Sequence, residues 1–217
     1  MTTLHLSDDD LRARLNACLS LTAAIPGAPQ RGDYDLNPAW RNAAPSERPL
    51  RPAAVLVPII ERKVGLNVLF TLRAAGLPAH AGQVSFPGGR AEQSDADAVA
   101  TALRETEEEV GLTREFISVI GALDPYETGT GFAIKPIVGL VREGFDLRPQ
   151  TSEVADIFEV PLRFLMDPIN HERHMRIWQG RERHFYAMTF DGHYIWGATA
   201  GMLVNLYERL QCTGAMI

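Results

Sequence analysis

A glycine-rich turn that leads into a strongly acidic helix constrains this 217-residue chain more than any other feature. The turn is Phe86-Pro87-Gly88-Gly89, and the residue pattern predicts the helix over residues 97–112. At about 100° per residue, one side of this helix is apolar and can pack on a sheet, while glutamates gather on the far flank. The apolar positions are Val99, Ala102, Leu103, Thr106 and Val110, and the acidic ones are Glu105, Glu108 and Glu109.

The acidic flank has the chemistry of a divalent-metal site. Glu105 and Glu109 are one helical turn apart, so their carboxylates can meet at one point. Oxygen-rich clusters of this kind suit Mg²⁺ or Mn²⁺. For an arbitrary acidic helix, a solvated surface is the commoner explanation. Here the glycine turn directly upstream and Gly111 as a helix stop favour the metal site.

The same residues resemble the Nudix hydrolase family, whose signature is G-x5-E-x7-R-E-U-x-E-E-x-G-U, where U is aliphatic. Residues 104–112 match its second half, apart from Thr106 in an aliphatic position. Gly89 and Asp95 supply its first half with one residue inserted, whereas strict counting from Arg104 falls on Arg90 and Ala96. The resemblance implies an α/β Nudix fold, in which a mixed β-sheet is packed between helices as an α/β/α sandwich.

The segment that precedes the helix narrows the resemblance to one branch of this family. Residues 69–89 look like the additional signature of the coenzyme A pyrophosphatase branch, roughly L-L-T-x-[TR]-[SA]-x3-R-x3-G-x3-F-P-G-G, with Pro78 in the place of an arginine. The likeness extends over residues 53–210. It implies metal-dependent hydrolysis of the diphosphate bond of coenzyme A or its derivatives, giving 3′,5′-ADP and 4′-phosphopantetheine.

Two other functions stay open. Because Pro78 departs from the pattern, the substrate of the hydrolase could be another nucleoside diphosphate compound, such as ADP-ribose, NADH or a nucleoside triphosphate. The chain could also be a non-catalytic nucleotide-binding module, although such modules usually lose the glutamates that are retained here. The general base could be a glutamate of the helix or one from a distant loop. Among the loop candidates, Glu153 is favoured over Glu127, because its flanking residues fit the branch pattern.

The resemblance also assigns roles to particular residues. The expected catalytic residues are Glu105, Glu108, Glu153 and Arg104, with Arg104 orienting the glutamates. The expected metal ligands for Mg²⁺ or Mn²⁺ are Glu105, Glu109, Glu108 and the carbonyl of Gly89. The expected substrate-binding residues are Arg73, His80, Gly88 and Gly89.

The charge and composition of the chain limit the kinds of molecule that it is expected to bind. A net charge of −6 argues against attraction to nucleic acid or an anionic membrane, so an enzyme for an anionic small molecule must bring its own cation. No apolar run has membrane-spanning length, and the first ten residues lack the basic region of a secretion signal, so we expect a cytoplasmic protein. Cys18 and Cys212 have no metal-ligand spacing around them, and neither do the histidines at 171, 174, 184 and 193.

The coarse organisation follows from periodicity. Residues 53–211 are predicted to form the Nudix hydrolase domain, and residues 1–52 a helix, capped by Ser7 with Asp10, and a long surface connection. Pro136 predicts an edge strand or a bulge, and Trp178, Phe185, Tyr186 and Trp196 are interpreted as contacts in the core or in a possible homodimer. Strands are predicted at 53–60, 67–73, 83–86, 116–123, 134–141, 157–160, 174–178 and 184–190, and helices at 161–165 and 199–210.

Overall fold

The computed structural model describes residues 7–20, 31–41, 49–178 and 180–211. Its helices are α1 (Asp8–Ser20), α2 (Pro38–Arg41), α3 (Ala98–Val110), α4 (Leu162–Leu165) and α5 (Ala198–Gln211), with 3₁₀ turns η1 (Arg114–Phe116) and η2 (Pro168–Asn170). Its strands are β1 (Arg31–Gly32), β2 (Arg51–Arg62), β3 (Gly65–Arg73), β4 (Val84–Ser85), β5 (Gly88–Arg90), β6 (Ile117–Ala122), β7 (Tyr126–Glu127), β8 (Phe132–Val141), β9 (Val154–Pro161), β10 (Glu172–Trp178), β11 (Arg181–Phe190) and β12 (His193–Trp196).

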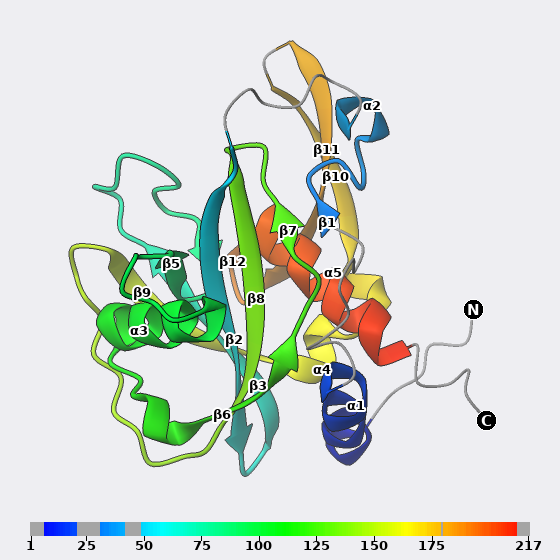
Figure 1. The fold of residues 1–217 in the computed structure, drawn as a ribbon. Coiled ribbons are helices and arrows are strands. Elements are labelled where there is room, and N and C mark those ends of the chain that lie inside the picture. Colours follow the sequence, from blue (N-terminus) through cyan, green and yellow to red (C-terminus); the bar gives the residue numbers. More distant parts are fainter. Residues whose placement is uncertain (1–6, 21–30, 42–48, 179, 212–217) are drawn as a thin grey trace.

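A mixed nine-stranded sheet forms the centre of the molecule (Figure 1). Its order is β1-β7-β8-β2-β3-β4, while β5 pairs with β2, β6 with β8 and β9 with β3. The β2–β8 and β1–β7 pairs are parallel and the other pairs are antiparallel. Strands β10, β11 and β12 form a second, antiparallel sheet. The expected mixed sheet is therefore confirmed.

Strand β2 shows why this sheet must lie between two layers of helices. Ala54 and Leu56 pack against α3, whereas Val57 and Ile59 join the cluster that includes α1 and α5. Its continuous apolar run is buried on both faces, as a strand with helices above and below must be. Figure 1 shows α3 on one side of the sheet and α1, α4 and α5 on the other, which confirms the α/β/α layering.

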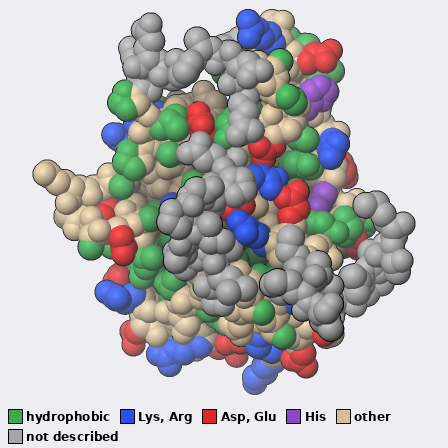
Figure 2. Space-filling view, turned by 45° about the vertical axis from the view of Figure 1, so that its right-hand side comes forward, with side chains coloured by type: hydrophobic (Ala, Val, Ile, Leu, Met, Phe, Trp, Pro, Cys, Tyr) green, Lys and Arg blue, Asp and Glu red, His purple; other side chains and the backbone are tan. Residues whose placement is uncertain are grey.

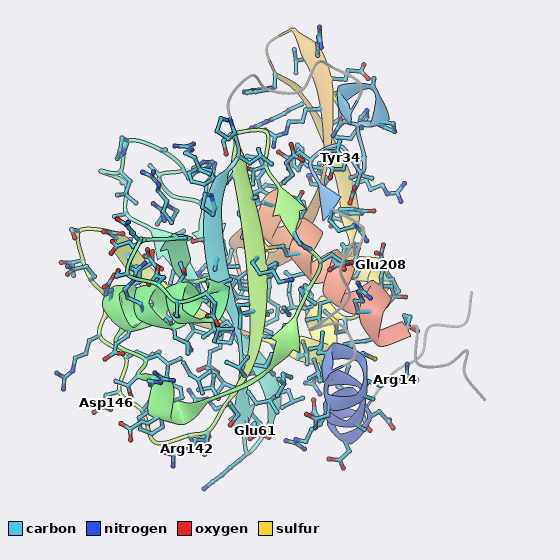
Figure 3. The ribbon with its side chains drawn as sticks, in the orientation of Figure 1. Arg14, Tyr34, Glu61, Arg142, Asp146 and Glu208 are labelled. Carbon is cyan, nitrogen blue, oxygen red and sulfur yellow. The ribbon has the colours of Figure 1, made fainter. Side chains whose placement is uncertain are left out.

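The N-terminal helix is capped as predicted. The Asp10 backbone N–H donates to the Ser7 hydroxyl, and the Ser7 N–H donates to the Asp10 carboxylate, each at 3.2 Å. The apolar side of α1 is buried in the main core, and Cys18 lies on that side. Arg14, labelled in Figure 3, donates to the Leu210 carbonyl at the end of α5 at 2.8 Å. Cys212 lies outside the described residues.

The prediction that Pro136 marks an edge strand is wrong. Strand β8 is interior, with β2 on one side and β6 and β7 on the other. The Pro136 carbonyl accepts from the Leu123 N–H, so the position of its missing N–H faces the corner between β6 and β7 rather than β2. The ladder with β6 does contain a bulge, but the extra residue, Ile120, belongs to β6. The predicted strand 83–86 is also shorter, since only Val84–Ser85 pairs.

The aromatic residues of the C-terminal half divide between two environments. Tyr186 packs against the main core cluster. Phe185 and Trp196 contact each other on the opposite face of the β10–β12 sheet, and the Arg176 guanidinium lies 4.5 Å from the Trp196 ring centroid. A homodimer stays a prediction. None of the described helices is long and apolar enough to cross a membrane, and Figure 2 shows acidic and basic side chains interspersed on the face it displays.

Part of the predicted surface connection lies outside the described residues. Residues 31–41 contact both sheets, through the β1–β7 pair and through Asn37. Asn37 is only 5% exposed. Its side-chain NH₂ donates to the His184 carbonyl at 2.9 Å, and its side-chain oxygen accepts from the His184 N–H at 2.8 Å. The Asn37 amide thus pairs with both backbone groups of His184 on β11. The division of the chain at residue 52 stays a prediction.

We expect Asn37→Ala to lower the free energy of unfolding by about 2–3 kcal/mol, because it removes the side-chain partners of both the N–H and the carbonyl of His184. Urea unfolding monitored by circular dichroism measures this. The control is Asn67→Ala, which removes one half-buried bond to Glu159 and should cost about 1 kcal/mol or less. Equal losses in the two variants would contradict the role of Asn37.

Candidate functional site

The helix of the predicted site has well-defined ends. Asp97 is its N-cap, and the Asp97 carboxylate accepts from the Ala100 N–H at 2.8 Å. Gly111 ends it with a φ of 72°, the left-handed conformation that glycine adopts without strain. The predicted helix stop at Gly111 is confirmed, and α3 lies within the predicted range 97–112. These caps fix which residues of α3 face the sheet.

The glycine turn allows two close approaches of the backbone. Gly88 has a φ of +151°, and a methyl group there would lie 2.5 Å from the Ala54 carbonyl oxygen and the Val55 Cα. At Gly89, a methyl group would lie 2.5 Å from the carboxylate of Glu105. Gly88 is therefore required for the turn to pack against the backbone of β2, and a side chain at Gly89 would displace the Glu105 carboxylate.

Glu109 is buried, which the helical wheel does not predict. It is 5% exposed, its carboxylate accepts from the Gly88 N–H at 3.1 Å, and Arg73 Nη1 lies 3.9 Å from its other oxygen. Burial raises the pKa of Glu109 to about 7, because the Gly88 N–H and Arg73 offset the loss of hydration only in part and the charges of Glu105 and Glu153 add to the rise. Glu109 is buried because the glycine turn at the start of β5 packs on it.

Arg73 reaches the same place from the end of β3. Its side chain is one-quarter exposed, yet its buried Nε has no hydrogen-bond partner among the described residues. An unpaired guanidinium N–H beside a buried carboxylate is a donor that a ligand oxygen could satisfy.

Arg104 holds the acidic residues around it. Its Nε and Nη2 donate to the two oxygens of Asp95 at 3.0 and 2.9 Å, a bidentate pair that holds the pKa of Asp95 well below its usual range. Its Nη1 lies 3.1 Å from Glu105 and 3.0 Å from Glu108. Asp95 therefore pairs with Arg104 despite the inserted residue. The sequence analysis assigns no role to Asp95. The one-residue shift of the motif is the only sequence feature that points to its pairing with Arg104.

The helix glutamates differ in their surroundings. Burial raises the pKa of Glu105, and the adjacent Arg104 guanidinium offsets part of that rise. The Glu108 side chain is 59% exposed. Among the described residues, no three Asp, Glu, His or Cys side chains already converge as metal ligands, since Arg104 Nη1 lies between Glu105 and Glu108.

The loop before β9 brings Glu153 to this site. The Gln150 N–H donates to the Glu109 carbonyl and the Ala74 N–H to the Glu153 carbonyl, each at 2.8 Å. The Glu153 charge raises the pKa of both Glu105 and Glu109. Glu127 instead lies in β7, where its carbonyl accepts from the Asp33 N–H.

His80 is placed away from the carboxylates. It is exposed in the loop between β3 and β4, with a φ of 58°, and its Nδ1 lies 2.8 Å from the Gln83 side-chain oxygen. Within the described part of the chain, no contact joins His80 to the acidic residues of α3. The structure thus brings together all of the predicted site residues except His80.

The assembled groups have the chemistry of a diphosphate and metal site. Carboxylate oxygens suit Mg²⁺ or Mn²⁺, and Arg73 suits a phosphate oxygen. The residues that could hold the metal are Glu105, Glu108 and Glu109, with Glu153 beside them. The donor set fits such an ion, because every candidate ligand is a hard oxygen.

Known proteins are similar to this chain in sequence and in fold. The NUDIX domain model matches residues 49–177. An uncharacterized Nudix hydrolase NudL of Photorhabdus laumondii is 41% identical over 161 residues, covering 74% of this chain and 86% of the relative, and NudL of Escherichia coli K12 is 38% identical over 157 residues, covering 72% and 81%. A MutT protein from Methanosarcina mazei has a similar fold, with a TM-score of 0.50 and 17% identity over 79% of this chain and all of that one. The chain therefore belongs to the Nudix hydrolase family.

Proposed function

We propose that this Nudix hydrolase cleaves the diphosphate bond of coenzyme A or a derivative, with Mg²⁺ or Mn²⁺, to 3′,5′-ADP and 4′-phosphopantetheine. The supporting observation is the path of residues 69–89, which resemble the coenzyme A signature. They form the end of β3, the loop to β4 and the glycine turn, and so carry Arg73 and the backbone of Gly88 and Gly89 to the acidic flank of α3.

The metal ligands in this proposal are Glu105, Glu108, Glu109 and the carbonyl of Gly89. A bound Mg²⁺ or Mn²⁺ would neutralise the diphosphate and lower the pKa of a water molecule. Glu109 is buried and the Glu105 side chain is 17% exposed, whereas Glu108 is exposed and can change rotamer to leave Arg104. Arg104, anchored on Asp95, keeps the helix glutamates in orientation.

The remaining residues act on the substrate and the water. Arg73 donates its unpaired Nε–H to a diphosphate oxygen, and Glu153 takes the proton of the attacking water. The water oxygen bonds to one phosphorus, the bridging P–O bond breaks, and the bridging oxygen leaves with the other phosphate. His80, exposed in the β3–β4 loop, is proposed to contact the substrate farther from the diphosphate.

Another nucleoside diphosphate compound is the alternative substrate. The observation that favours it is Pro78, which is exposed in the β3–β4 loop where the branch pattern has an arginine. That loop then offers His80 as its one basic side chain. A non-catalytic role is disfavoured, since the three helix glutamates and Glu153 are retained around one site.

We expect the protein with Mg²⁺ to convert coenzyme A to 3′,5′-ADP and 4′-phosphopantetheine, as measured by chromatographic separation of the products. ADP-ribose, NADH and nucleoside triphosphates are tested in parallel. Cleavage of one of these without release of 3′,5′-ADP from coenzyme A would reject the proposed substrate. Cleavage of none would support the binding module instead.

We expect Glu105→Gln and Glu109→Gln each to lower kcat by about 100-fold or more, because each removes a charged metal ligand. The matched control is Glu107→Gln, on the exposed side of the same helix, which should keep near-normal turnover. Circular dichroism checks that all three variants are folded. Unchanged turnover in both site variants would refute the metal assignment.

The raised pKa of Glu109 predicts a pH-dependent stability. With a pKa near 7 in the folded protein and about 4.5 unfolded, its contribution to stability is complete below pH 4.5 and is lost as pH rises through 7. In EDTA, raising the pH from 5 to 7.5 should therefore cost the wild type up to about 3 kcal/mol more than Glu109→Gln. Urea unfolding at each pH measures the difference.

Mg²⁺ should restore much of this loss in the wild type, because a cation stabilises the ionised carboxylate. The control Glu107→Gln should keep the wild-type pH dependence. If Glu109→Gln and the wild type lose the same stability between pH 5 and 7.5, Glu109 is not the titrating group.

A further inference from the structure

A groove of about 450 Å³ lies at the N-terminal end of α3, over the first residues of β2 and β8. Its volume is in the range of small-molecule sites. It is lined by the first turn of α3, by Ala91 and by Lys135, but by none of the helix glutamates. It is therefore a separate hollow from the carboxylate site, and its chemistry can be considered by itself.

The walls of the groove are narrow and largely aliphatic. Most lining residues are alanines and prolines, together with Ile134, and none of the lining residues is aromatic. An adenine base would find no ring to stack on, whereas a saturated chain would bury its methylene groups against these walls.

Two groups of opposite charge supply polar contacts. Lys135 stands on β8 beside Ala54, half-buried, and its ammonium has no hydrogen-bond or ion-pair partner within the described ranges. Asp97 uses one carboxylate oxygen to accept the Ala100 N–H. The other polar lining residues, Asp95 and Thr101, are bonded to each other. A neutral ligand that carries both acceptors and donors complements this pair better than a charged one.

One chain segment connects the groove to the carboxylate site. Ala91 lines the groove and is two residues beyond Gly89, a distance of about 7 Å in an extended strand. Asp95 also lines the groove, and its carboxylate binds the Arg104 guanidinium that contacts Glu105. A chain attached to a diphosphate at Gly89 can therefore reach the groove within a few bonds.

Resting on the proposed function, we infer that this groove holds the pantetheine arm of the coenzyme A substrate. That arm is uncharged, has aliphatic carbons, and carries two amides. Lys135 donates to an amide carbonyl, and the free oxygen of Asp97 accepts an amide N–H. The nucleotide half lies on the other side of the diphosphate, outside the groove. Recognition of the arm is thus separate from the groups that act on the diphosphate.

The test uses Lys135→Met, which removes the donor, and Ala91→Phe, which fills the groove. The matched control is Lys63→Met, at the other lysine of the chain, exposed in the turn between β2 and β3. KM and kcat are measured for coenzyme A and for the methyl ester of 3′-phosphoadenosine 5′-diphosphate, which keeps the nucleotide and diphosphate but lacks pantetheine. Thermal melts check folding.

We expect both groove variants to raise KM for coenzyme A about tenfold, the factor that corresponds to one charge-assisted hydrogen bond, with no such rise for the methyl ester. Lys63→Met should match the wild type. Pantetheine should inhibit coenzyme A cleavage competitively in the wild type and more weakly in Lys135→Met, a comparison that does not depend on the larger substitution.

Coenzyme A cleavage with unchanged KM in both groove variants would overturn this inference and leave the proposed function standing. An equal rise of KM for both substrates would also overturn it, because the groove would then act on the diphosphate end. Failure of the wild type to cleave coenzyme A would overturn both, and the assay of the unmodified protein separates that case from the others.

Discussion

The close approach of Gly88 and Gly89 to α3 is the contact on which the rest of the site depends. With a side chain at either position, the turn would meet β2 or the Glu105 carboxylate at 2.5 Å. Because the turn fits there, the Gly88 N–H reaches Glu109, and Glu109 is buried at the sheet side of the acidic flank. The local absence of side chains thus creates an environment of low dielectric, in which carboxylates hold protons more tightly and bind cations more strongly.

Two arginines balance this cluster of like charges in different ways. Arg104 forms a bidentate pair with Asp95 and also contacts Glu105 and Glu108, so it holds these glutamate side chains in place. Arg73 is not fully used, since its Nε is unpaired in the described structure and its closest carboxylate oxygen is 3.9 Å away. The first arginine is structural support, and the second has donors left for an anion.

The sequence predicts some of this and misses the rest for identifiable reasons. The Gly111 stop of α3 and the two-sided burial of β2 follow from local patterns, because both depend on residues adjacent in the chain. The burial of Glu109 does not, because a helical wheel contains no information about β5. The edge-strand prediction from Pro136 is wrong for the same reason. Strands β6 and β7, which pair with β8 on the side that Pro136 faces, come from another part of the chain. Strands β1, β7 and β12 are too short for a periodic signal.

The sequence motifs locate the carboxylates of α3 but cannot locate the groove. The groove is assembled from β2, β8 and the start of α3, and its members share no spacing in the sequence. Asp95 links the two regions, because it binds Arg104 on one side and lines the groove on the other. A residue inserted between Gly89 and Arg104 lengthens this link while the Asp95 pair preserves the geometry of the glutamates. Because this pair forms despite the insertion, Arg104 keeps its contacts with Glu105 and Glu108.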